Sequence, residues 1–150
     1  MCSLKGDNVL LDSCLSTCDT EWRGMAKVAD LGVSTVVDPS TGLAMERMSC
    51  GTLPYMAPEM FQDRPVGREV DVYALGMLMW EMYHCKQPHM GMSPLHLRMA
   101  MTFGSMLPRC SLAMEPDYKL VMLACWEAEP CQRPSMAELE QAFELLLQHL

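Results

Sequence analysis

One stretch constrains the fold of this chain more than any other, because residues 70–84 are apolar around the whole circumference of a helix. They read Val-Asp-Val-Tyr-Ala-Leu-Gly-Met-Leu-Met-Trp-Glu-Met-Tyr-His. A helix that is hydrophobic on all sides must be buried. At about 1.5 Å per residue it spans only about 22 Å. Asp71, Glu81 and His84 also interrupt it, so it falls short of the roughly 20 apolar residues that cross a membrane. The stretch predicts a central core helix and no membrane contact.

Asp71 places a carboxylate at the start of this predicted core helix. A negative charge there suits the positive end of the helix dipole. A carboxylate in buried surroundings also needs hydrogen-bond donors. We expect those donors to come from another segment of the chain, which Asp71 then holds in place.

The composition indicates one soluble domain over residues 1–150. A chain of 150 residues can bury a real core, and a 50% apolar content excludes a disordered acidic tail. The net charge of −8 argues against nucleic acid as a partner, since that would favour a basic face. No secretory signal opens the chain, so we expect a cytoplasmic location.

The eight cysteines lack the doubled Cys-x(2–4)-Cys spacing of zinc sites. In a cytosolic chain they are expected to be reduced thiols. Cys85 and Cys125 fall in apolar helical runs, where cysteine behaves as a small hydrophobic residue. A metal site built from His84, Cys85 and His89 is conceivable, but a metal or redox protein ranks lowest among the function classes. The 17 methionines are expected to fill gaps in the core.

The N-terminal half reads as short strands and a long loop. Residues 9–11 and 26–29 are apolar strands, which pair in an irregular hairpin around residues 13–24. Gly32 ends the second strand and permits an unusual backbone angle. Residues 33–56 show no sustained period. A loop of this length in a compact domain is usually functional or disordered.

Helix start signals divide the remainder of the chain. Pro58 suits the first position of a short helix. Ser93 and Pro94 begin a helix that runs to about residue 103, and Pro116 begins another. Ser135 caps the last helix, with a capping-box Glu138 three residues later.

The last two predicted helices each show an apolar stripe. On the helix after Pro116 the stripe consists of Tyr118, Val121, Ala124 and Cys125, widened by Leu120, Leu123 and Trp126. On the last helix the predicted buried face consists of Leu139, Phe143, Leu146 and Leu147. Together these patterns predict a mainly α chain.

Five segments in sequence order resemble motifs of one family. They are residues 4–11 (Leu-Lys-Gly-Asp-Asn-Val-Leu-Leu), 30–32 (Asp-Leu-Gly), 51–59 (Gly-Thr-Leu-Pro-Tyr-Met-Ala-Pro-Glu), 71–76 (Asp-Val-Tyr-Ala-Leu-Gly), and Cys-Trp at 125–126 through Arg-Pro-Ser at 133–135. They resemble the catalytic loop, the Asp-Phe-Gly motif, the activation-segment end, the central helix and the closing motif of eukaryotic protein kinases. The last is similar to that of the tyrosine-kinase-like group. The resemblance covers the whole chain, and chance would have to supply each spacing independently.

The resemblance implies a fold and an activity. It implies the C-terminal lobe of a kinase domain, with a short β-hairpin at the catalytic loop and the N-terminal lobe absent. The family uses ATP and magnesium to phosphorylate proteins, and Thr52 with the residues after it resembles the Ser/Thr type. Protein substrates or protein partners are therefore expected.

The resemblance also implies roles for individual residues. Asn8 and Asp30 match the amide and carboxylate that hold magnesium in the family, although Asn8 as a turn cap and Asp30 as an acceptor of backbone amides remain the alternative. Lys5 matches the lysine that faces the transferred phosphate. Gly51 and Thr52 open the activation-segment end.

Three further matches imply structural roles. Glu59 and Arg133 should form a buried ion pair that ties the activation segment to the bend before the last helix. Asp71 should accept backbone amides of the catalytic loop.

The match fails at the N-terminal edge. Ser3 occupies the position of the catalytic Asp, and Cys2 that of the preceding Arg. A serine hydroxyl is a poor general base, and the Gly-rich loop and its lysine have no counterpart here. We expect the isolated chain to be inactive and its binding of ATP to be doubtful. It is then either a fragment of a kinase or a non-catalytic, pseudokinase-like module that binds proteins. Apolar surface that the missing lobe would cover favours partner binding or self-association.

Overall fold

The computed structural model describes residues 4–11, 24–44, 51–62, 64–103 and 106–148. In these ranges the chain forms four α-helices and one two-stranded antiparallel sheet, which confirms the mainly α prediction. The helices are α1 (Glu69–His84), α2 (Pro94–Phe103), α3 (Pro116–Cys125) and α4 (Met136–Gln148). The strands are β1 (Val9–Leu11) and β2 (Ala26–Val28). Short 3₁₀ helices are η1 (Gly6–Asn8), η2 (Leu53–Tyr55), η3 (Pro58–Met60) and η4 (Pro130–Gln132).

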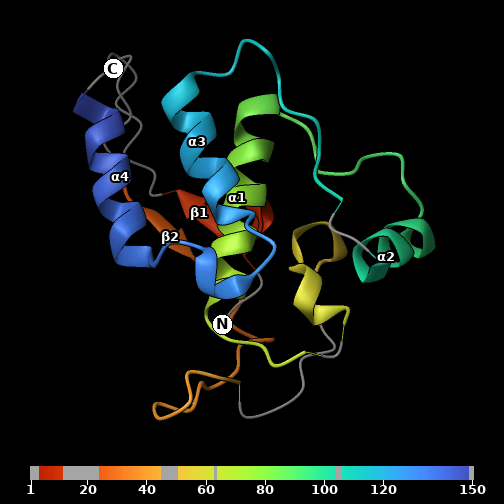
Figure 1. Ribbon diagram of the computed structural model, residues 1–150. Helices are drawn as coiled ribbons and strands as arrows, with labels where there is room; N and C mark the ends of the chain where they lie inside the picture. The colour runs from red at the N-terminus through yellow and green to blue at the C-terminus, as the bar shows by residue number, and fades with distance from the viewer. Residues whose placement is uncertain (1–3, 12–23, 45–50, 63, 104–105, 149–150) are drawn as a thin grey trace.

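The helix α1 is the centre of the core. It packs against α3, η1, η2 and η4, and Figure 1 shows α4, α3 and α1 side by side, with α2 set apart beyond α1. Tyr73, Met77 and Met79 are almost fully buried. The predicted burial on all sides is therefore confirmed up to Trp80, whereas Met82 is exposed in the last turn. Among the described residues no helix is long and apolar enough to span a bilayer.

The close approach of α1 to α3 depends on Gly76. A Cβ atom there would lie 2.7 Å from the indole nitrogen of Trp126 and 2.8 Å from Cβ of Cys125. Met122 and Cys125 are fully buried at this contact, and burial raises the pKa of the Cys125 thiol to about 12. Cys125 thus behaves as the expected small hydrophobic residue.

Some predicted core positions are wrong, because the neighbours of each helix cover only part of its apolar surface. On α3, Leu120 and Leu123 are exposed, while Met122 supplies the buried position that the predicted stripe left out. On α4, Leu139 is buried but Leu147 is 70% exposed. These side chains lie on helix faces that no other described element covers.

Cys85 is a further correction to the predicted core. It is exposed, since it lies after the end of α1 in a left-handed conformation with φ of 49°. The described cysteines, Cys85, Cys110, Cys125 and Cys131, are all free thiols.

The predicted caps at Ser93 and Ser135 form, and Glu115 supplies a third cap that was not predicted. The Ser93 hydroxyl accepts the amide of His96 at 3.3 Å at the start of α2. The Glu115 carboxylate accepts the amide of Tyr118 at 2.7 Å at the start of α3. At α4, Ser135 and Glu138 form the reciprocal capping box, in which the Glu138 carboxylate accepts the Ser135 amide at 2.7 Å and the Ser135 hydroxyl accepts the Glu138 amide at 3.3 Å. Pro58 also begins η3 as predicted.

The two strands pair in the register Val9 with Val28 and Leu11 with Ala26, which confirms the predicted pairing. The connection around residues 13–24 lies almost wholly outside the described residues. Several apolar side chains on and beside the hairpin are exposed, namely Leu10, Leu11, Val28, Leu31 and Val36. The hairpin and the residues after it thus expose several apolar side chains, while the prediction that they lie where a missing lobe would sit stays a prediction.

Most of the predicted loop at residues 33–56 lacks regular structure where it is described. A turn at residues 38–42 is held by the Asp38 carboxylate, which accepts the amide and hydroxyl of Ser40, both at 2.7 Å. These hydrogen bonds lower the pKa of Asp38. Isolated bridges join Val37 to Ala44 and Leu43 to Gly67, so the turn lies beside the entry to α1.

Candidate functional site

The hairpin brings Asn8 and Asp30 to the same end of the sheet. Asn8 ends η1 immediately before β1, and its carbonyl accepts the amide of Ala29 at 2.8 Å. This hydrogen bond extends the strand pairing by one residue, so Asp30 follows directly beyond it. Asn8 is buried, whereas Asp30 is exposed. A carboxamide and a carboxylate therefore lie at one end of the hairpin.

Asp30 adopts the unusual backbone angle at this turn. Its φ is 58°, in the left-handed region, which Asp tolerates better than most residues because its short side chain bonds locally. Its carboxylate accepts the amide of Gly32 at 3.3 Å. The sequence-based assignment of the unusual angle to Gly32 is therefore wrong, because Gly32 has no positive φ. The bond to Gly32 fixes the backbone around Asp30.

Lys5 lies in the same loop, just before η1. Its side chain is 25% exposed, and its ammonium nitrogen lies 3.6 Å from the Asp7 carboxylate. The loop from Lys5 to Asn8 therefore presents one cation, one anion and one amide within a single turn.

Glu81 of α1 lies between this loop and Tyr55 of the segment at residues 51–59. Its carboxylate accepts the hydroxyl of Tyr55 at 2.9 Å, and the same carboxylate oxygen would lie 3.0 Å from a Cβ at Gly6. Burial, the hydrogen bond to Glu81 and the negative charges of Glu81 and Asp7 all raise the pKa of Tyr55. From the sequence alone, Glu81 is only an interruption of the core helix, because its partners are distant in sequence.

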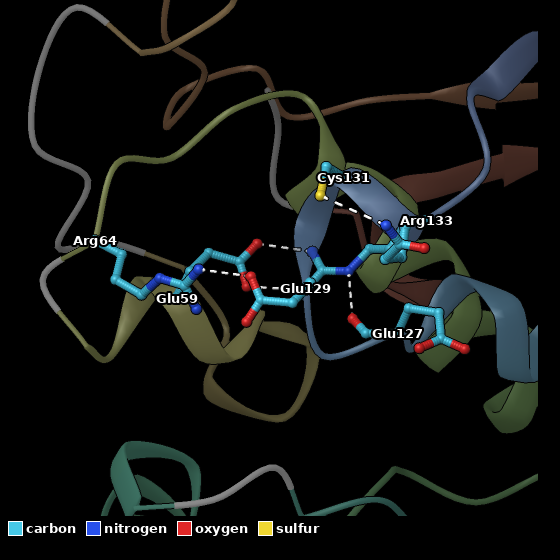
Figure 2. A network of polar contacts seen from close by, with 7 residues as sticks. Glu59, Arg64, Glu127, Glu129, Cys131 and Arg133 are labelled. Atoms are coloured by element: carbon cyan, nitrogen blue, oxygen red, sulfur yellow. Dashed lines mark hydrogen bonds and ion pairs between the residues drawn. The ribbon is translucent and has the colours of Figure 1, made fainter.

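Arg133 is the centre of a second polar cluster, shown in Figure 2. Its guanidinium donates to both carboxylate oxygens of Glu59, at 2.7 and 2.9 Å. It also donates to the carbonyls of Glu69 at 3.0 Å and Glu127 at 2.9 Å. The guanidinium carbon lies 5.1 Å from the centre of the Tyr73 ring. One side chain thus fastens η3, the start of α1 and the residues just after α3 to the bend before α4.

The predicted ion pair between Glu59 and Arg133 is confirmed, including its burial. Glu59 is 1% exposed and Arg133 is 6% exposed. Arg64 and Glu129 form a second pair nearby at 2.9 Å, but this pair is open to solvent. Of these two pairs only the first is enclosed by protein, and its architectural role stays a prediction.

The remaining predicted site residues lie in the segment after Gly51, at the start of α1 and at the N-terminus. Gly51 has φ of 153°, and a Cβ there would lie 3.1 Å from Cγ of Met56. The carbonyl of Thr52 accepts the amide of Tyr55 at 2.9 Å, which begins η2. Asp71 is half-buried in the first turn of α1 and has an interaction partner, while its acceptance of catalytic-loop amides stays a prediction. Ser3 and Cys2 lie outside the described residues.

The conceivable metal site at His84, Cys85 and His89 does not form. The His84 ring has a partner on each nitrogen, because Nδ1 donates to the Trp80 carbonyl at 2.9 Å and Nε2 accepts the Ser111 amide at 3.2 Å. Cys85 donates to the carbonyl of Met82 instead. Within the described ranges, no three histidine, cysteine or acidic residues gather in a way that would hold a metal ion. His84 is instead a structural residue that connects α1 to the loop before α3.

Comparison with known proteins agrees with this geometry. Residues 3–143 match the family described as protein tyrosine and serine/threonine kinase. The chain is 30% identical over 94% of its length to the serine/threonine/tyrosine-protein kinase HT1 of Arabidopsis thaliana, covering 33% of that protein. It is 31% identical over 91% of its length to the probable serine/threonine-protein kinase drkD of Dictyostelium discoideum, covering 10% of it. It is 30% identical over 91% of its length to the serine/threonine-protein kinase CTR1 of Arabidopsis thaliana, covering 15% of that protein. The chain thus spans a third or less of the length of these relatives.

Proposed function

This chain belongs to the protein tyrosine and serine/threonine kinase family, and from that premise we propose that it forms the C-terminal lobe of such a domain. In this proposal it supplies the metal-holding and substrate-facing side of ATP-dependent phosphoryl transfer to serine and threonine hydroxyls of proteins. The observation that carries the proposal is the hairpin, which extends its pairing to Asn8 and Ala29 and so brings Asn8 and Asp30 to one end.

The donor set at this end of the hairpin fits magnesium. Mg²⁺ is a hard cation that takes oxygen ligands, usually one or two from the protein together with phosphate oxygens and water. The Asn8 amide oxygen and the Asp30 carboxylate are donors of that kind. When bound, the ion would neutralise charge on the ATP phosphates.

The chain's own residues then orient the reaction. Lys5 lies in the same turn as Asn8 and carries the positive charge that would face the transferred phosphate. Glu81 lies beside Gly6 of that turn and accepts the hydroxyl of Tyr55, in the segment beginning at Gly51 and Thr52 against which the substrate would lie. Because this reaction depends on positioning more than on covalent chemistry, holding these residues in place is the chain's main contribution.

The isolated 150-residue chain should nevertheless transfer phosphate poorly. Its sequence holds no Gly-x-Gly-x-x-Gly segment to cover the phosphates. Ser3 stands where the family has its base, and a hydroxyl accepts protons poorly at neutral pH. A non-catalytic binding module has less support, because the relatives named above are all described as kinases.

Mn²⁺ binding tests the proposal on the chain as it stands. Free Mn²⁺ is followed by electron paramagnetic resonance during titration of the parent, of Asp30→Asn and of Asp117→Asn. Asp117 is an exposed carboxylate on α3 and serves as the matched control. We expect one weak site in the parent and in Asp117→Asn, and binding weakened at least about tenfold in Asp30→Asn, because one of two protein ligands loses its charge.

Equal binding by the parent and Asp30→Asn would refute the metal assignment. An equal loss of Mn²⁺ affinity in Asp30→Asn and Asp117→Asn would show that the ion binds only through the general negative charge of the chain.

A further inference from the structure

The residues between Glu81 and Glu115 differ in charge from the rest of this acidic chain. Residues 82–114 contain no Asp or Glu, but they contain Lys86, Arg98 and Arg109, while the whole chain has a net charge of −8. All three cations are exposed. The segment includes α2, which carries Arg98 and no acidic residue.

The exposed face of α2 is apolar as well as basic. Leu95, Met99 and Phe103 follow one another at helical spacing and are 66, 51 and 85% exposed. The opposite face, with Leu97 and Met101 buried, holds the helix to the core. Exposed apolar side chains at i, i+4 and i+8 form a continuous stripe. Nothing among the described residues covers this stripe, and Arg98 stands beside it.

The helix α4 has the complementary surface. Its exposed side chains include Met136, Glu140, Glu144 and Leu147, whose spacing places them along one side of the helix. From residue 134 to residue 148 the chain has no Lys or Arg. This face is therefore apolar and acidic, where that of α2 is apolar and basic.

The two faces cannot meet within one chain. Figure 1 shows α4 at one side of the molecule and α2 at the other, with α3 and α1 between them. We propose that α2 of one copy docks on α4 of a second copy. The charge complementarity selects this occupant, since a basic and an acidic face attract while their apolar side chains exclude water.

The arrangement joins two different surfaces, so the interface is heterologous. Such contacts form rings or open chains rather than a closed two-fold dimer. Helices of ten and thirteen residues offer a small contact area. The association is therefore weak and sensitive to salt, as expected for charge pairs at the edge of an interface.

Two charge reversals test the proposal by analytical ultracentrifugation. Arg98→Glu spoils the α2 face and Glu144→Arg spoils the α4 face. Each variant alone should associate at least about tenfold more weakly than the parent, because like charges then oppose each other. Mixed in equal amounts, the two variants should associate about as strongly as the parent, because both contacts between unlike variants then join opposite charges. The double variant should associate like the parent.

Controls separate this contact from other routes to association. Leu11→Ser, on the exposed hairpin, should associate like the parent, whereas Phe103→Ser should weaken association as Arg98→Glu does. Circular dichroism checks that each variant keeps its helix content, and Phe103→Ser replaces Arg98→Glu if the latter is misfolded. A parent that stays monomeric up to about 100 µM at low salt, the range in which small interfaces still associate, would overturn the proposal. So would a mixture that shows no gain over either variant alone.

Discussion

Replacement of Arg133 by alanine should remove a large share of the stability of this chain. The side chain donates four hydrogen bonds, of which two go to Glu59 and two go to backbone carbonyls. Arg133→Ala leaves the Glu59 carboxylate, only 1% exposed, without its counter-charge. Removal of one partner from a buried ion pair costs about 3–5 kcal/mol, mainly because the remaining charge stays buried.

The expected loss is large enough to measure directly. Domains of this size have a stability of about 5–15 kcal/mol. With a urea dependence of about 2 kcal/mol per molar, the unfolding midpoint should fall by about 1.5–2.5 M. Urea unfolding followed by circular dichroism measures this shift.

Arg64→Ala is the matched control for this experiment. It removes the same kind of side chain from a neighbouring pair of similar length (Figure 2), but the side chains of that pair are 42 and 61% exposed. Its midpoint should stay close to that of the parent, because surface pairs contribute little. Glu59→Gln added to Arg133→Ala should recover part of the loss, because no charge then remains buried. An Arg133→Ala midpoint equal to that of Arg64→Ala would refute the reasoning.

Three further changes have expected outcomes in urea unfolding. Gly76→Ala should destabilise the chain by about 1–3 kcal/mol, because the added Cβ would lie 2.7 Å from Trp126. Ser135→Ala should cost about 1 kcal/mol, because the cap on the Glu138 amide is lost. Burial lowers the pKa of His89, so the folded chain binds fewer protons than the unfolded chain below about pH 6.5. Protonation of His89 therefore does not affect the free energy of unfolding above that pH, and it lowers this free energy as the pH falls toward the lowered pKa. His89→Asn should reduce this loss of stability.

Each of these outcomes has a contrary result. If Gly76→Ala equals or exceeds the parent in stability, only the better helix propensity of alanine is acting, and the contact with α3 is not tight. An unchanged midpoint for Ser135→Ala would mean that the cap contributes nothing. The exposed His96 is the control for His89, and equal pH dependence in His96→Asn and His89→Asn would contradict the assigned cause.

The sequence predicts well those features that depend on nearby residues. The helix starts at Ser93 and Ser135 follow from side chains that bond backbone three residues away. The central helix follows from apolar residues on every side of a helical period. The pairing of Glu59 with Arg133, in contrast, came only from resemblance to a family, because the two residues are 74 positions apart.

Features set by distant packing were missed or misassigned. The bond from Tyr55 to Glu81 has no local signal, since it joins a loop to the centre of a helix. Leu120 is apolar yet exposed, because α3 has neighbours on some of its faces only. The left-handed angle falls on Asp30 rather than Gly32, because the carboxylate bonds the next turn of backbone. Glycine marks where such an angle is permitted, whereas the local hydrogen bond decides where it occurs.

Transfer of radiolabelled phosphate to a generic protein substrate tests the central claim most directly. The account predicts no measurable transfer by the chain alone. It predicts transfer once Ser3→Asp, which restores about 10²–10⁴-fold of general-base catalysis, is combined with the N-terminal lobe of a related kinase. That transfer should disappear when Asp30→Ala is added, because the metal ligand at the end of the hairpin is then lost. Robust transfer by the unmodified chain, or transfer by the combined protein that survives Asp30→Ala, would contradict the account.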